Sequence, residues 1–237
     1  MPVIITMAMI RLIRTGTAMN ESAALLKLMS WLSPVFPIGG FAYSAGLEQA
    51  VNTGHVTDRG SLADWIEAQL VHGAQRNDTL ILVQAHRCAA DKAKLAELSD
   101  LCRALCVSHE RLSETVGQGT SFVDAVSHWV GPGHFPGRET PLPVAVGIAA
   151  GIEGIAPRLT TGAYLHAFVS NQLQCAIRLS VVGQDGAAQA LAGLEAAIAK
   201  TAEHAANATL DDLGGAAFIA DIASMNHETL ERRLFLS

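Results

Sequence analysis

Apolar residues recur at helical spacing along most of the chain. Between Ser22 and Leu32 the residues Leu25, Leu28, Met29 and Leu32 recur at helical spacing, and Pro34 marks the end of the segment. Residues three and four apart share one face of an α-helix, so this pattern predicts an amphipathic helix. The same periodicity predicts further helices over residues 61–76, 79–90, 95–112 with an amphipathic continuation to about 130, 144–155, 160–182, 187–206 and 210–225.

Polar and proline-rich segments separate these helices. Ser61 with Asp64 resembles a capping box that opens the second helix, and Asn77 or Asp78 is expected to cap the third. Residues 131–143 contain four prolines and three glycines, which predicts a loop, and residues 184–186 predict a turn. Only 5% of residues are aromatic and no strand-like alternation occurs. We therefore expect an all-α protein with a single compact bundle-like domain of about eight to ten helices.

Composition narrows the class of function. Hydrophobic residues make up 50% of the 237 residues and charged residues only 16%, so apolar side chains are expected on the surface, where patches of them mark interfaces. The net charge of −6 and the absence of a basic run argue against nucleic-acid binding. The cysteines, which are too few and too irregular for a disulfide framework, indicate reduced thiols in a cytoplasmic protein: Cys88, Cys102, Cys106 and Cys175.

The N-terminus begins with an apolar segment that does not fit a signal peptide. Residues 1–10 are apolar apart from Thr6, and Arg11 and Arg14 follow the apolar run instead of preceding it. We expect residues 1–24 to form a poorly ordered extension, with Met19 as an alternative start. No stretch reaches the roughly 18 apolar residues that a membrane span needs, so we expect no membrane insertion.

One short pattern is a candidate metal site. Cys102, Cys106 and His109 form C-x3-C-x2-H, and on one continuous helix they would share a narrow arc. Leu98, Leu101 and Leu105 fall on the same arc, which indicates a core face where cysteine behaves as a small hydrophobe. We therefore expect no metal and no cofactor, with Cys102, Cys106 and His109 kept as the alternative.

Enzyme motifs do not occur in the sequence. There is no H-E-x-x-H, no phosphate-binding loop and no nucleophile elbow, so we expect a protein that is not an enzyme. Gly147, Gly151 and Gly154 lie on one side of a predicted helix, where small residues permit close helix packing. Gly147 and Gly151 are candidates for a dimer interface.

Two segments have unusual sequences. In residues 34–41 two prolines fix the backbone and two adjacent glycines free it, which predicts one specific irregular path. Phe36 and Phe41 in this segment, and Tyr43 just after it, are suitable interface anchors. The tail, residues 226–237, places adjacent arginines before a Leu-Phe-Leu end, and we expect it either to fold back on the body or to await a partner.

These two segments carry a resemblance to a known family. Ser33-Pro34, then residues 37–44 (Pro-Ile-Gly-Gly-Phe-Ala-Tyr-Ser) and 46–48 (Gly-Leu-Glu), resemble the N-terminal signature of the UreF family of urease accessory proteins. The C-terminal run through Met225, residues 227–229 (His-Glu-Thr) and residues 233–235 (Arg-Leu-Phe) is similar to that family's ending. The turn near residues 181–186 lacks the family's usual proline, and Leu236 stands where arginine is common.

The resemblance implies an all-helical accessory protein that forms a homodimer. It also implies binding to the UreD/UreH scaffold and the UreG GTPase, which deliver nickel to the urease apoprotein. On this basis we divide the chain into an extension (1–24), a helical domain (25–225) and a partner-docking tail (226–237). The expected partner-binding residues are Pro37, Gly39, Gly40, Phe41, Tyr43, Ser44, Glu48, His227, Glu228, Arg233, Leu234, Phe235 and Ser237.

Our hypothesis is that the tail orders when it meets the scaffold, with Leu234 and Phe235 burying apolar surface and Arg233 making a charged contact. Two alternatives remain open at this stage. The first is a metallochaperone that binds nickel through its own cysteine and histidine residues. The second is a helical enzyme, which would need several titratable groups converging in a pocket.

Overall fold

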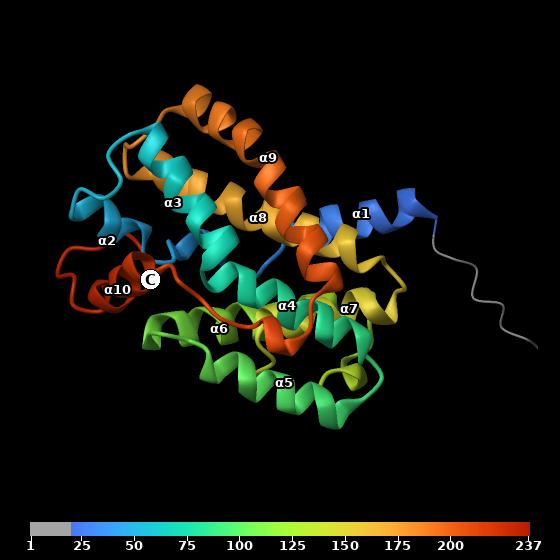
Figure 1. The fold of residues 1–237 in the computed structure, drawn as a ribbon. Helices are drawn as coiled ribbons and strands as arrows, with labels where there is room; N and C mark the ends of the chain where they lie inside the picture. The colour runs from blue at the N-terminus through green and yellow to red at the C-terminus, as the bar shows by residue number, and fades with distance from the viewer. Residues whose placement is uncertain (1–19) are drawn as a thin grey trace, which may run out of the picture.

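The computed structural model describes residues 20–237 (Figure 1). Within this range every regular element is helical, which confirms the predicted all-α class. The α-helices are α1 (Glu21–Trp31), α2 (Leu47–Asn52), α3 (Arg59–His72), α4 (Ala74–Arg87), α5 (Lys92–Ala104), α6 (His109–Val126), α7 (Leu142–Ile152), α8 (Pro157–Arg178), α9 (Gln184–Asn207) and α10 (Phe218–His227). Three short 3-10 helices, Gly40–Ala42, Pro132–His134 and Leu210–Asp212, lie in the connections.

Helices α4 and α7 pack closely at the centre of the body. The backbone carbonyl of His86 lies only 2.6 Å from where a Cβ on Gly151 would stand, and Leu82 of α4 crowds Gly147 in the same way. Glycine at these positions is therefore what allows the two helix backbones to approach. The prediction that Gly147 and Gly151 form a dimer interface is wrong, because α4 of the same chain covers that face.

The body contains two hydrophobic cores, and the α4–α7 pair belongs to the first. The first contains Trp31 and Phe122 and is built mainly from α1, α4, α6 and α7. The second joins α2, α3, α8, α9 and α10, and it includes Phe235 from the tail. Helix α8 contributes to both, so the long α8 links the two halves of the body (Figure 1).

Several predicted helix starts are wrong by a few residues. Asp58 caps α3, accepting a hydrogen bond from the backbone of Ser61, so Ser61 is the third helical residue and not the cap. Helix α4 begins at Ala74, which places Asn77 and Asp78 inside it. Competing polar residues sit close together at both starts, and periodicity alone does not choose among them.

Helix ends and breaks also differ from the prediction. The leucine pattern over residues 95–112 crosses two helices, because α5 ends at Ala104 and Ser108 caps α6. Residues 184–186 form the first turn of α9, and the chain turns before them. The single helix predicted over residues 210–225 is wrong, because the chain there forms a 3-10 helix, a non-helical stretch and then α10. Between α6 and α7, the predicted loop is confirmed apart from its last residues, which start α7.

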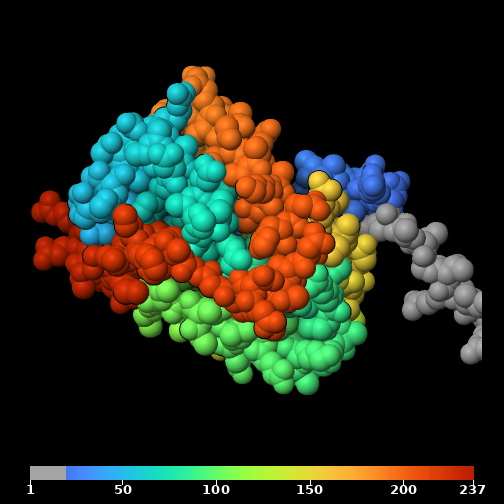
Figure 2. Space-filling model, viewed as in Figure 1, coloured from blue at the N-terminus to red at the C-terminus, as the bar shows by residue number. Residues whose placement is uncertain are grey.

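The C-terminal part of the chain lies on the surface of the body. Figure 2 shows α10 and the tail beside the α2–α3 region on one side and α6 on the other, and α10 contacts both α2 and α6. Among residues 20–237, no helix combines the length and the apolar character that crossing a membrane requires. The expected extension at residues 1–24 falls largely outside the described residues, and α1 starts at Glu21.

Candidate functional site

The tail folds back and reaches the irregular segment at the other end of the sequence. The backbone N–H of Leu236 donates to the Ala42 carbonyl at 2.8 Å, and that of Ser44 donates to the Ser237 carbonyl at 2.9 Å. The two segments that carry the family signature are therefore in direct contact. Of the two expectations for the tail, folding back on the body is the one observed.

Glycine makes the local path of the irregular segment possible. Gly39 and Gly46 have positive φ angles of 72° and 82°, a left-handed conformation that side chains disfavour. At Gly46 an added Cβ would also come within 3.0 Å of the Ser224 backbone nitrogen in α10. This close approach brings α10 against the start of α2, where Glu48 is located.

The Glu48 carboxylate is the acceptor that holds the tail backbone. It accepts the Leu234 N–H at 2.7 Å and the Phe235 N–H at 3.0 Å. Hydrogen bonds to a charged acceptor contribute about 1.5–3 kcal/mol each. The side chain of Glu48 is nearly buried, so few waters compete for these bonds.

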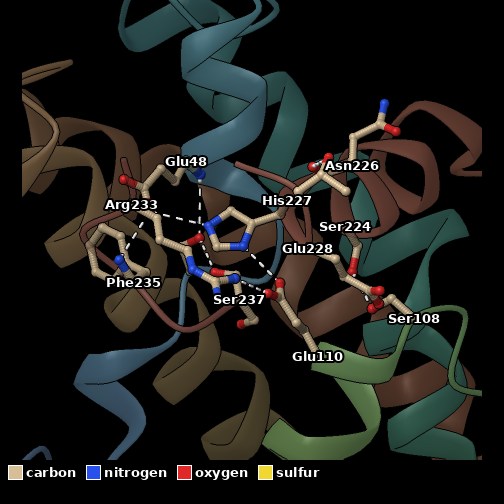
Figure 3. Close-up of polar contacts among 12 residues, drawn as sticks. Glu48, Ser108, Glu110, Ser224, Asn226, His227, Glu228, Arg233, Phe235 and Ser237 are labelled. Atoms are coloured by element: carbon tan, nitrogen blue, oxygen red, sulfur yellow. Dashed lines mark hydrogen bonds and ion pairs between the residues drawn. The ribbon is translucent and has the colours of Figure 1, made fainter. Parts of the chain in front are cut away.

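His227 lies between two carboxylates at the end of α10. Its Nε2 is 3.2 Å from Glu48 and its Nδ1 is 2.7 Å from Glu110, and the imidazole has no exposed surface. Figure 3 shows the ring between these two acidic groups, which come from α2 and α6. Glu110 also pairs with Arg233, so a second residue from the C-terminal part of the chain is held there.

Arg178 of α8 joins the tail to the irregular segment. Its guanidinium lies 4.2 Å above the Phe235 ring and donates to the Phe41 carbonyl at 2.6 Å. A cation over an aromatic ring contributes about 0.5–2 kcal/mol, depending on how far it is desolvated. Sequence analysis did not select Arg178 as a site residue.

A buried ionic cluster continues from the tail into the core. Arg111 pairs with Asp78, which also accepts from the Tyr164 hydroxyl at 3.1 Å, and Glu114 bonds Ser237 at 3.2 Å. Burial opposes the charge on Arg111, but the neighbouring carboxylates raise its pKa above the usual value. Burial raises the pKa of Glu114, although Arg111 opposes this. Asp78, Arg111 and Glu114 were not selected as site residues, because charged side chains in a helical sequence normally indicate a solvated face.

The predicted partner-binding residues fall into two groups. Five have side chains buried within the chain and serve there to hold the tail: Ser44, Glu48, His227, Phe235 and Ser237. The others are at least partly exposed: Pro37, Gly39, Gly40, Phe41, Tyr43, Glu228, Arg233 and Leu234. The second group keeps its predicted role as partner contacts, while the first shapes the surface on which those contacts lie.

The alternative metal residues do not converge. Cys102 is buried on α5, Cys106 lies in the connection after it, and His109 is the first residue of α6, so the predicted shared helical arc is wrong. Burial raises the pKa of both thiols, which disfavours the thiolate that binds metals. Over residues 20–237, no group of three or more histidine, cysteine or acidic side chains is placed to hold a metal ion.

Helix α10 presents apolar side chains to solvent. Phe218, Ile219, Ile222 and Met225 are all exposed, with Phe218 at 67% of its surface. Their spacing places them on one side of the helix, opposite the buried Ala220 and Ala223. We call these four residues the α10 surface. Exposed Leu234 and Leu236 of the tail add to the apolar area in this part of the chain.

A second apolar region lies around α1. Leu25, Met29 and Phe41 are exposed and line an open cavity of about 1800 Å³ between α1, residues 33–41 and α8. We call these three residues the α1 surface. An isolated monomer rarely exposes several large apolar side chains together, so both surfaces indicate contacts with other proteins.

The helical body exposes two apolar surfaces, and its buried polar network holds its own tail. These features define the class of protein as an interaction protein. Residues 56–195 match the family model described as UreF. The chain is 48% identical over 220 residues to the urease accessory protein UreF of Rhizobium etli strain CFN 42, covering 92% of this chain and 98% of the relative.

Other relatives give the same result over nearly the whole chain. Identity is 46% over 228 residues with urease accessory protein UreF of Bradyrhizobium diazoefficiens, covering 93% of this chain and 94% of the relative. It is 48% over 222 residues with that of Agrobacterium fabrum, covering 93% and 100%. The chain belongs to the UreF family of urease accessory proteins, and it is accordingly an accessory protein and not an enzyme.

Proposed function

We propose that this protein acts in the cytoplasm as a docking subunit for the UreD/UreH scaffold and the UreG GTPase, and so supports nickel insertion into the urease apoprotein. The observation that carries the proposal is the α10 surface, an apolar helix face left exposed beside a tail that the body holds in one conformation. An apolar helix face of this kind is suited to a hydrophobic groove on a partner.

The scaffold is assigned to the α10 surface and the neighbouring tail. Ile222 and Phe218 are the proposed anchors, with Leu234 extending the apolar area and Glu228 and Arg233 at its polar edge. The buried bonds from Glu48 to the tail backbone keep this surface ordered before binding. A preformed surface costs less conformational entropy on association than a disordered tail would.

The α1 surface is assigned to a second copy of this chain. Leu25, Met29 and Phe41 stand at the opening of the cavity against α8, and a homodimer would cover them. Pro37 lies in the same segment as Phe41 and is exposed, so it is a proposed contact of the assembled complex. The GTPase is proposed to bind the complex that the homodimer forms with the scaffold.

Two substitutions, one on the α10 surface and one on the α1 surface, test the two assignments, and each variant serves as the control for the other. Ile222→Asp places a charge on the α10 surface and is expected to prevent binding of purified scaffold while the chain remains dimeric. Met29→Asp is expected to give a monomer that still binds the scaffold. Size-exclusion chromatography with light scattering measures both, on the chain alone and mixed with scaffold and GTPase. A wild-type chain that remains monomeric and ignores both partners would refute the proposed function.

A further inference from the structure

The short turn that carries Phe41 has little internal support. We call residues 40–44 the Phe41 turn; its first three residues form a 3-10 helix in which no side chain is buried. Its own backbone bonds run from the Ala42 N–H to the Gly39 carbonyl and from the Tyr43 N–H to the Gly40 carbonyl, both at 3.1 Å. Short 3-10 segments have poorer hydrogen-bond geometry than α-helices. The conformation of the turn therefore depends on the elements packed against it.

Helix α8 holds one side of the Phe41 turn through the backbone carbonyls of the turn. Three side chains of α8 donate to it: Asn171 to Tyr43 at 3.0 Å, Gln172 to Ser44 at 2.9 Å and Arg178 to Phe41 at 2.6 Å. The Phe41 side chain itself is 71% exposed and lines the cavity beside the α1 surface. Helix α8 thus fixes the backbone of a turn that presents its aromatic side chain to solvent.

The tail supplies further partners for the same turn. The Ala42 carbonyl, which α8 does not engage, accepts the Leu236 N–H at 2.8 Å, and the Ser44 N–H donates to the Ser237 carbonyl at 2.9 Å. A hydrogen bond restricts both of its partners. The docked tail therefore orders the Phe41 turn to the same extent as the turn orders the tail.

Arg178 connects the tail to the exposed part of the turn. Its guanidinium lies 4.2 Å from the centre of the Phe235 ring and donates to the Phe41 carbonyl. The Phe235 side chain is buried, so the docked tail shields one face of the guanidinium from water, and a cation over a ring is held more strongly when it is desolvated. When the tail leaves, water competes for the bond from Arg178 to Phe41. The contacts on both sides of the turn then weaken together.

We propose that the tail and the Phe41 turn order each other, so that protein binding at the α10 surface and tail and protein binding at the α1 surface strengthen each other. This inference rests on the assignment of the scaffold and of a second copy to these surfaces under the proposed function. Two states of the chain are involved. In one the tail is docked and the Phe41 turn is fixed, and in the other the tail is released and the turn is loosened.

Each partner binds the docked state better, for a reason that the contacts supply. The scaffold meets the tail in its docked conformation, and the second copy meets Phe41 on an ordered backbone. Each partner therefore shifts the chain toward the state that the other prefers. Such coupling is reciprocal, and it typically changes an affinity by about 5–150-fold.

Amide hydrogen exchange tests the intramolecular step in the full chain. The Met29→Asp variant is the background, so that a second copy does not itself protect the turn. The Ala42 and Tyr43 amides bond within the turn and not to the tail, so their protection reports the order of the turn. The Leu236 amide, which bonds to the Ala42 carbonyl, reports docking of the tail.

Two variants release the tail in different ways. Glu48→Ala removes the acceptor of the tail backbone, and Phe235→Ala removes the ring under Arg178. Each is expected to lower the protection of the turn amides by about tenfold or more, with amides of α7 unchanged, while Glu97→Ala on the exposed face of α5 changes neither. Loss of protection in the tail alone overturns the proposal, and so do turn amides that exchange freely while the tail is docked.

Affinity measurements test the coupling between the two surfaces. Purified scaffold is titrated onto the dimeric wild-type chain and onto the Met29→Asp monomer, and the dimer dissociation constant is measured with and without scaffold. Both ratios are expected to be equal, at about fivefold or more. Arg178→Met should reduce both ratios, because it removes one link between the tail and the turn. Ratios that this substitution leaves unchanged indicate direct contacts between the scaffold and the second copy, and they overturn the route through Arg178.

The inference and the proposed function fail in distinguishable ways. A chain that dimerises and binds scaffold, but with equal scaffold affinity in its monomeric and dimeric forms, overturns the coupling and leaves both assignments in place. A chain that forms neither complex refutes the proposed function and the coupling between partners with it. The exchange experiment on the isolated chain then still decides whether the tail and the Phe41 turn order each other.

Discussion

Removing the Glu48 carboxylate is expected to release the tail. Glu48→Ala leaves the backbone N–H groups of Leu234 and Phe235 without their acceptor, which was at 2.7 and 3.0 Å. At about 1.5–3 kcal/mol for each charge-assisted bond, the loss is about 3–6 kcal/mol of docking free energy. Since each 1.4 kcal/mol is a factor of ten, the population of released tail rises by roughly two to four orders of magnitude.

The effect on global stability should be smaller than this sum. Once the tail has left the body, its N–H groups bond to water, so the total cost cannot exceed the docking free energy of the tail. The central pair α4 and α7 buries its own core side chains, including Leu82 and Ile148, without any contribution from the tail. We therefore expect a folded, helical chain with an exposed end.

Trypsin cleavage beside Arg232 and Arg233 measures the released population. When opening is fast compared with cleavage, the cleavage rate follows the equilibrium population of the open form. Mass spectrometry of the released C-terminal peptide gives this rate. Glu97→Ala is the matched control, because it removes the same charge from an exposed position on α5. Cleavage of Glu48→Ala at a rate within twofold of this control would refute the reasoning.

Four further predictions concern the packing and chemistry of the described residues. Gly147→Ala should destabilise the chain by about 1–3 kcal/mol, because the added methyl group meets the α4 backbone. Gly193→Ala should stabilise it by about 0.5–1 kcal/mol, because the α9 surface has open space there and alanine favours a helix. Thermal unfolding measures both changes. Arg178→Met should increase tryptic release of the tail, but by less than Glu48→Ala, because it loses one hydrogen bond and one cation–π contact. Arg111→Met should cost about 3–5 kcal/mol in urea unfolding by leaving Asp78 buried without its partner. Burial raises the pKa of Asp78, so that loss should grow as pH increases from 5 to 8, and a loss independent of pH would contradict this. Cys102 and Cys175 should resist a thiol reagent at pH 8 in the folded chain, because burial raises the pKa of both thiols, that of Cys175 to about 12. Rapid modification of all four cysteines would contradict this prediction.

The sequence predicts the helices well where one face is continuously apolar. The glycines of α7 lie in a close helix contact. In α1 the predicted apolar face is only partly right, because Leu28 is buried but Leu25 and Met29 are exposed, and the buried Trp31 was not part of that face. Boundaries were less predictable where several capping residues compete, as at Asp58 and Ser61. The break between α5 and α6 was missed because the leucine spacing continues across it, although Ser108 offered a capping signal.

The candidate site was only partly predictable for a physical reason. Glu48 and His227 were selected through the family signature, but Glu110, which faces His227, and Arg178, which lies over Phe235, were not. A buried ion pair depends on contacts between segments more than 100 residues apart, as the bonds from His227 to Glu110 and to Glu48 show. Local periodicity contains no information about such contacts, and charge in a helix normally indicates exposure.

The contact between the irregular segment and the tail also constrains when the surface can form. Ribosomes synthesise residues 227–237 after every helix from α1 to α9 has been made. A chain whose synthesis stops early can fold the α4–α7 centre and yet leave Glu48 and Glu110 without His227 and Arg233. A chain that stops before residue 227 is therefore expected to lack the ordered surface even where its central helices fold.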